Sequence, residues 1–128
     1  MIEAERQNLT AAQFLKRIME QTGEMPVALS SITVAELAHG IYRADTPERR
    51  QRRRTFLDDL KAAVPVYAIT EATAELVGKI GAESSATGVT IPFDDLLIAG
   101  SAIERGYAVA TRNLRHFHGI GGLKVVSL

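Results

Sequence analysis

Short apolar runs alternate along the chain with longer segments whose apolar residues recur every three or four positions. The longer segments have the period of helices that bury one face, whereas the short runs are typical of strands buried on both faces. These runs predict four strands, at residues 26–29, 64–69, 107–110 and 123–126. Because the strands are short, apolar and separated by helices, the pattern predicts a parallel sheet covered on both faces, an α/β three-layer fold.

Residues with capping preferences mark the ends of the first two predicted helices. Thr10 and Gln13 have the spacing of a capping box that opens a helix, and Gly23 suits its end. Thr33 and Glu36 have the same spacing and predict a second helix of about three turns.

Three further helices follow. Thr46 predicts the start of an arginine-rich helix, and Thr70 the start of a long helix that ends near Gly88. Residues 94–105 are so apolar that they predict a buried helix, which Gly106 ends. A loop, residues 111–122, is expected between the last two strands.

Composition narrows the class of protein. The 128 residues, 46% hydrophobic and 23% charged, predict one globular domain over residues 1–128. Fifteen Lys and Arg balance fifteen Asp and Glu, so net charge gives no overall attraction to nucleic acid or membrane. The absence of cysteine excludes disulfides, Cys-ligated zinc and thiol catalysis. No apolar run approaches the roughly 18 residues of a membrane span, and the charged start lacks a signal-peptide core, so we expect a cytoplasmic protein.

Ligands bind outside the carboxyl ends of the strands in parallel α/β sheets, and polar residues occur at three places that qualify for this edge. Carboxylate oxygens without cysteine favour Mg²⁺ or Mn²⁺, and such an ion can bind a phosphodiester and activate a water for in-line attack. The candidates are Glu36 after the first strand, Asp94 and Asp95 at the start of the apolar helix, and Thr111, Asn113 and His116 after the third strand.

Each candidate also has a structural explanation. Glu36 is explained equally well as a capping-box residue, and either Asp94 or Asp95 is explained as a helix cap. Thr111 and Asn113 suit a strand end and a turn.

His118, a second histidine in the loop at residues 111–122, is interpreted as a surface residue. A dense run of arginines lies in the helix that is predicted to start at Thr46. Such a run is usually a solvated helix face, and the alternative is contact with a partner or with phosphate. The arginines are Arg49, Arg50, Arg52, Arg53 and Arg54.

Three segments in order resemble motifs of PIN-domain ribonucleases. Residues 30–40 (SSITVAELAHG) resemble the second motif, and residues 95–100 (DLLIAG) resemble the third. Residues 110–117 (ATRNLRHF), with a later Gly122-Leu123 pair, resemble the fourth. The combination is similar to the VapC-type toxins of bacterial toxin–antitoxin pairs and runs from about Met1 to the C-terminus.

The resemblance implies roles for individual residues. Glu36 and Asp95 match acidic metal ligands of the family and are the expected catalytic carboxylates, with Asp94 an extra carboxylate beside the second. Thr111 and Asn113 match the Thr-x-Asn signature, in which Asn113 orients a ligand or a water. His116 stands where many members carry an acid, so the fourth carboxylate of the usual quartet is missing or replaced, which argues against a second ion.

The resemblance also implies a function. We expect a Mg²⁺- or Mn²⁺-dependent endoribonuclease toxin that cuts single-stranded regions of RNA. A cognate antitoxin is the expected inhibitor, and homodimer formation is expected as well. Arg112 and Arg115 are candidates for guiding the RNA backbone.

The family's first motif, an apolar strand that runs into an Asp, has no match before Glu3. Residues 1–6 look like the helix that follows this motif, so we expect a PIN-like sheet whose first strand is absent from this chain. Because unpaired ladder groups cost roughly 1–3 kcal/mol each when buried, we expect a mis-started or truncated reading of a longer protein, which the upstream in-frame DNA tests.

Two other functions stay open. One is a catalytically inactive module that binds an antitoxin through residues 10–22 and 34–62. The other is a PIN-like nuclease that acts on DNA or folded RNA outside toxin systems.

Overall fold

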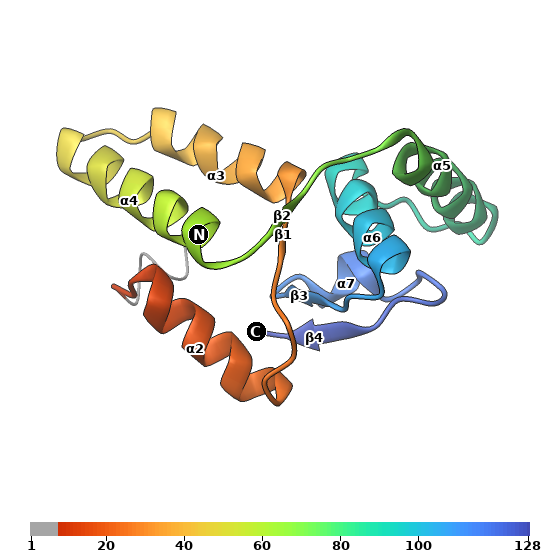
Figure 1. The fold of residues 1–128 in the computed structure, drawn as a ribbon. Coiled ribbons are helices and arrows are strands. Elements are labelled where there is room, and N and C mark those ends of the chain that lie inside the picture. The colour runs from red at the N-terminus through yellow and green to blue at the C-terminus, as the bar shows by residue number, and fades with distance from the viewer. Residues whose placement is uncertain (1–7) are drawn as a thin grey trace. The chain divides into compact units, whose positions relative to one another are not determined.

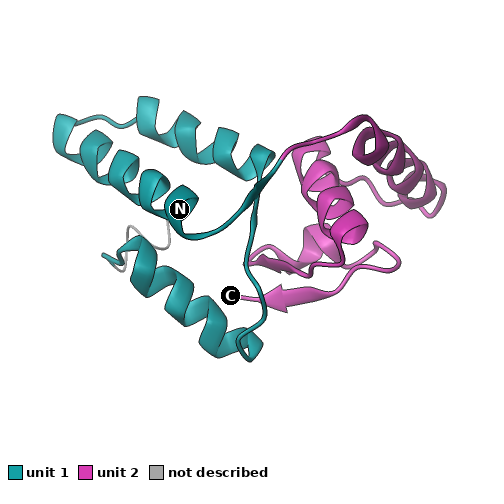
Figure 2. Ribbon diagram, in the orientation of Figure 1, with its two compact units in different colours: residues 1–67 teal, residues 68–128 magenta. Residues whose placement is uncertain are grey.

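The computed structural model describes residues 8–128, and the helix-like start expected at residues 1–6 lies outside this range. The chain forms two compact units, residues 1–67 and 68–128 (Figure 2), and each is described by itself. No helix among the described residues is both long and apolar enough to cross a membrane.

The first unit contains three helices and one pair of strands among its described residues (Figure 1). Its strands are parallel, with Leu29 opposite Val66. The elements are α2 (Ala11–Thr22), β1 (Leu29–Ser30), α3 (Ser31–Tyr42), α4 (Pro47–Ala63) and β2 (Val66–Tyr67).

The core of the first unit forms where α2 and α3 both pack against α4. Ile41 and Leu57 are its most deeply buried large side chains. Phe14 of α2 meets Phe56 of α4 with ring centroids 5.7 Å apart, a separation typical of stabilising aromatic pairs. These contacts give the first unit its own hydrophobic core.

The second unit places two long helices beside a second parallel pair of strands, in which Val109 lies opposite Val125. Its core gathers residues of α5, α6, α7 and the segments around them. The elements are α5 (Glu71–Ala86), α6 (Phe93–Arg105), β3 (Val109–Thr111), α7 (Leu114–Phe117) and β4 (Val125–Ser127).

Small residues of α6 allow α5 to approach closely. Ala99 is completely buried, and a methyl group added at Gly100 would lie 2.6 Å from Cγ2 of Val77. Thr73 of α5 is also fully buried, and its hydroxyl donates to Oε1 of Glu104 at 2.8 Å. Apolar packing and a polar contact therefore both join the two helices.

Most predicted helix ends are confirmed. Thr10, Thr46 and Thr70 are N-caps whose side chains accept from backbone N–H groups three residues on. Gly23 and Gly106 end their helices in the left-handed conformation, with φ of 72° and 74°. A glycine there avoids the steric cost that a Cβ atom brings at positive φ.

The predicted start of α3 is wrong. The helix begins at Ser31 directly after β1, and the Ser30 hydroxyl accepts from the N–H of Ile32. Thr33 therefore lies inside the helix, and the Thr33–Glu36 capping box does not form. Ser30, the last residue of β1, provides an earlier cap, which the capping-box spacing concealed.

The loop predicted at residues 111–122 contains a short helix, α7. Its four residues are too few to produce a helical period, so the pattern had no signal for it. Phe117 of α7 is 3% exposed, which shows that burial of one aromatic side chain stabilises this turn of helix.

The four predicted strands and their parallel pairing are confirmed, although each is only two or three residues long. Within residues 8–128 they form two separate two-stranded sheets in place of the one sheet expected. Each described strand therefore has only one hydrogen-bonded neighbour.

Gly100→Ala should lower the free energy of unfolding by about 1–3 kcal/mol, because the added methyl group overpacks the α5–α6 contact. Gly78→Ala is the matched control, since no atom beyond its own stretch of helix lies within 4 Å of where the added methyl group would stand, and alanine favours the helix over glycine. Urea unfolding followed by circular dichroism measures both. Equal stability of the two variants would contradict the close approach of α5 and α6.

Candidate functional site

A carboxylate and an imidazole from two different motifs meet in the second unit. Nδ1 of His116 lies 2.6 Å from Oδ2 of Asp95, although the residues are 21 positions apart in sequence. The Asp95 side chain is 16% exposed and that of His116 38%. The Asp95 carboxylate is therefore largely shielded from bulk water, whereas the imidazole is reachable from the surface.

The N-terminus of α6 positions the carboxylate. The helix begins at Phe93 after Pro92, and no side chain caps it. Asp95 lies in the first turn beside the buried Leu96, whereas Asp94 is exposed. Neither aspartate is the helix cap, so this structural explanation fails for both.

The turn after β3 positions the imidazole. The Thr111 hydroxyl accepts from the N–H of Asn113 at 2.9 Å, and the Asn113 carbonyl accepts from the N–H of His116 at 3.1 Å. Phe117, the next residue, is buried in the core of the second unit. The turn and the buried ring together direct His116 toward α6.

The remaining candidate residues are exposed on their elements. Glu36 lies on α3 in the first unit and is exposed. Asn113 lies at the N-cap position of α7, where its side chain makes no capping hydrogen bond. Arg112 and Arg115, which flank Asn113, are exposed as well.

The Asp95 carboxylate is suited to bind a divalent ion as one ligand of a larger set. Within residues 8–128, no three His, Asp or Glu side chains gather as a metal-binding group. Mg²⁺ usually keeps several waters and takes one or two carboxylates together with substrate phosphates. Asp95 therefore fits as one carboxylate ligand of such a set, and does not form a complete site alone.

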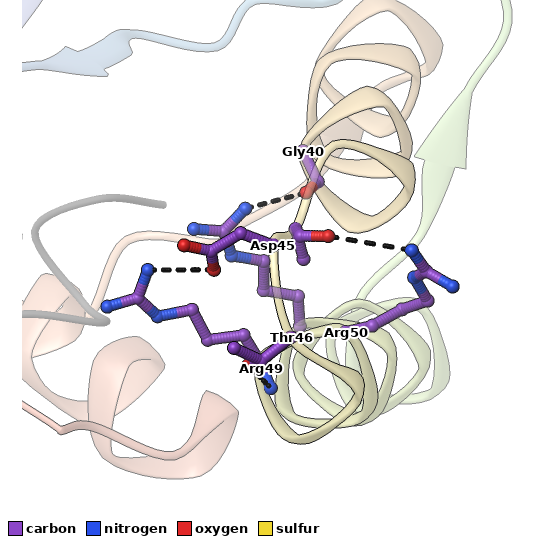
Figure 3. Close-up of polar contacts among 7 residues, drawn as sticks. Gly40, Asp45, Thr46, Arg49 and Arg50 are labelled. Carbon is purple, nitrogen blue, oxygen red and sulfur yellow. Dashed lines mark hydrogen bonds and ion pairs between the residues drawn. The ribbon is translucent and has the colours of Figure 1, made fainter.

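The arginine-rich stretch of α4 makes contacts within the first unit (Figure 3). Arg49 pairs with Asp45 at 3.0 Å, and Arg50 contacts the Ala44 carbonyl at 3.5 Å. Arg54, further along the helix, pairs with Asp58 at 3.1 Å.

Arg53 makes the shortest of these contacts. Its Nη1 donates to the Gly40 carbonyl of α3 at 2.6 Å. Part of the arginine stretch thus satisfies carbonyl groups at the end of α3 and is not a purely solvated face.

A pocket of about 620 Å³ lies in the first unit, between the start of α2 and one face of α4. It combines apolar side chains, Phe56 among them, with charged groups of both signs. The lining residues on α4 include Glu48, Gln51, Arg52, Thr55 and Asp59.

Comparison with known proteins identifies the family. The family model described as "PIN domain" matches residues 1–123. The chain belongs to the PIN-domain family. This one match extends over parts of both compact units.

Curated relatives place the chain with VapC-type members of this family. It is 33% identical over 99 residues to the tRNA(fMet)-specific endonuclease VapC of Shigella flexneri, covering 77% of this chain and 72% of the relative. It is 32% identical over 112 residues to ribonuclease VapC2 of Haemophilus influenzae, covering 88% and 81%. The resemblance read from the three motifs is confirmed.

Solved structures support the same fold. DNA-bound VapBC from Salmonella typhimurium matches with a TM-score of 0.78 at 28% identity, over 98% of this chain and 90% of that one. VapBC2 from Rickettsia felis, bound to a fragment of its promoter, matches with a TM-score of 0.77 at 23% identity, over 90% and 84%. The predicted PIN-like α/β fold is therefore confirmed.

Arg53→Ala should lower the free energy of unfolding by about 1–2 kcal/mol, because a hydrogen bond from a charged group to the Gly40 carbonyl is lost. Arg52→Ala, in the same helix and exposed, should change it by less than about 0.5 kcal/mol. Thermal unfolding of the Arg53→Ala and Arg52→Ala proteins tests this difference. An equal effect of both substitutions would show that Arg53 does not stabilise the end of α3.

Proposed function

We propose that this VapC-type chain is a Mg²⁺- or Mn²⁺-dependent endoribonuclease toxin that cuts single-stranded regions of RNA in the cytoplasm. Nuclease activity is supported by the names of its relatives from Shigella flexneri and Haemophilus influenzae. The observation that carries the metal-dependent chemistry is the shielded Asp95 carboxylate beside His116.

Asp95 and Glu36 are the proposed carboxylate ligands of the ion, Glu36 because it matches the family's second motif. When bound, a divalent ion polarises the phosphodiester and activates a water for attack on phosphorus. The side-chain amide of Asn113 makes no capping bond to α7, which suits a role in orienting a ligand.

Arg112 and Arg115 are proposed to attract the RNA backbone. Both are exposed; Arg112 directly precedes Asn113 and Arg115 follows it by two positions. Contacts with phosphate carry no sequence information, so these arginines would set the affinity and position of RNA and leave the choice of cleavage site to other contacts.

Asp95→Asn should reduce metal-dependent RNA cleavage at least about 100-fold, because the carboxylate charge that holds the divalent ion is lost. Such an ion stabilises the transition state by several kcal/mol. Asp94→Asn is the matched control, since this carboxylate is exposed, lies one position away and should leave cleavage within about twofold. A labelled single-stranded RNA, with Mn²⁺ and with or without chelator, provides the assay. Equal cleavage by wild type and Asp95→Asn would contradict the assignment, as would cleavage that survives the chelator.

We also propose that an antitoxin neutralises the protein by docking on the first unit. The Salmonella typhimurium and Rickettsia felis neighbours were solved as VapBC complexes. The pocket beside α4 is lined by residues 8–11 and by residues between 47 and 59, most of them within the ranges expected to contact an antitoxin. An apolar pocket with charged walls suits an amphipathic segment of a partner.

Thr55→Arg should weaken antitoxin binding at least about 10-fold, equivalent to about 1.4 kcal/mol, because a long charged side chain enters the pocket. Ala74→Arg adds the same charge to an exposed position of α5, outside the first unit, and should leave binding unchanged. Calorimetric titration with the small protein encoded beside this gene measures both affinities. Unchanged binding to Thr55→Arg would place the antitoxin elsewhere.

A second candidate function is a partner-binding module without nuclease activity. The pocket favours it. Antitoxin binding without metal-dependent cleavage would support this alternative.

We also propose that the protein forms a homodimer, and light scattering measures this directly.

A further inference from the structure

Nδ1 of His116 and Oδ2 of Asp95 lie within hydrogen-bond distance of each other, and the tautomer of the imidazole decides which atom donates. At 2.6 Å, the contact is shorter than most hydrogen bonds between nitrogen and oxygen. In the tautomer with its hydrogen on Nδ1, the imidazole donates and the carboxylate accepts.

This bond restricts a motion that would otherwise be easy. The torsion that turns an aspartate carboxylate about its Cβ–Cγ bond has broad minima, so an isolated carboxylate rotates at little cost. A fixed donor on Oδ2 selects one orientation. Because the Asp95 side chain is largely shielded, water competes poorly for the same oxygen.

The donor itself is held by the core. His116 lies in α7 between Asn113, which accepts its N–H, and Phe117, which is 3% exposed. Movement of the His116 backbone away from Asp95 would require α7 to turn, and that turn would withdraw the Phe117 ring from the core. The core therefore holds the backbone from which the imidazole reaches Asp95.

We infer that His116 is a positioning residue that orients the Asp95 carboxylate for a divalent ion through its Nδ1–H, and that it is not itself a metal ligand. The inference rests on the proposed metal-dependent function. Outer groups that hold a ligating carboxylate typically contribute 10- to 100-fold to metal affinity. The family's acid at this position would instead place a second negative charge beside Asp95.

Calorimetric titration of the full chain with Mn²⁺ tests this role without any measurement of cleavage. His116→Ala should weaken Mn²⁺ binding by about 10- to 100-fold, because the donor is lost. His116→Asn should retain affinity within about threefold, since its amide nitrogen is as many bonds from Cα as Nδ1 and also donates. His118→Ala, which removes an exposed histidine on the other side of Phe117, should bind as wild type does.

Three results would overturn the inference. Wild-type affinity in His116→Ala, with affinity lost in Asp95→Asn, would remove the role of His116 and leave the proposed function intact. Equal loss in His116→Ala and His116→Asn, with unchanged thermal unfolding, would make the imidazole itself a ligand. If wild type binds no Mn²⁺, the metal-dependent function fails and the role of His116 fails with it.

A measurement on the metal-free protein examines the bond itself. Nuclear magnetic resonance of ¹⁵N-labelled histidine should find His116 with its hydrogen on Nδ1, and Asp95→Ala should relieve this preference. A His116 ring with its hydrogen on Nε2 alone would contradict the inference, because Nδ1 could then not donate.

Discussion

The second unit depends on how closely α5 and α6 approach each other. Gly100 has no side chain at this contact and the fully buried Ala99 has a small one, so Val77 packs directly against the α6 backbone. The same helix contacts β3 and α7. α6 is thus fixed on one side by α5. Asp95 lies in the first turn of α6, so its backbone is held by this packing.

The sequence was most informative where one residue determines local structure. The sequence predicted the threonine caps of α2, α4 and α5, because a threonine hydroxyl accepts from a backbone N–H group at the start of a helix. It also predicted the helix ends at Gly23 and Gly106, because glycine adopts a positive φ without steric cost. The start of α3 was missed since two caps competed and the earlier one, Ser30, continues directly from a strand. The single sheet was expected because the strands are short, apolar and separated by helices, a pattern that does not determine which strands pair.

The candidate site was predicted in its residue types more fully than in its geometry. Asp95 and His116 were identified through separate motifs, but nothing in their spacing indicated a direct hydrogen bond across 21 positions. That contact depends on α7, a helix too short to show periodicity. The roles of Glu36 and Asn113 stay predictions, because they derive from motif similarity.

Phe117 and His116 are neighbours in a four-residue helix, one buried in the core and the other bonded to the carboxylate. Order at the site and folding of the second unit are therefore thermodynamically linked. Any ligand that binds Asp95 only in this arrangement stabilises the native state, by about 2.7 kcal/mol at a hundred times its dissociation constant. By the same linkage, loosening the packing around Phe117 would weaken such a ligand without altering any group that touches it.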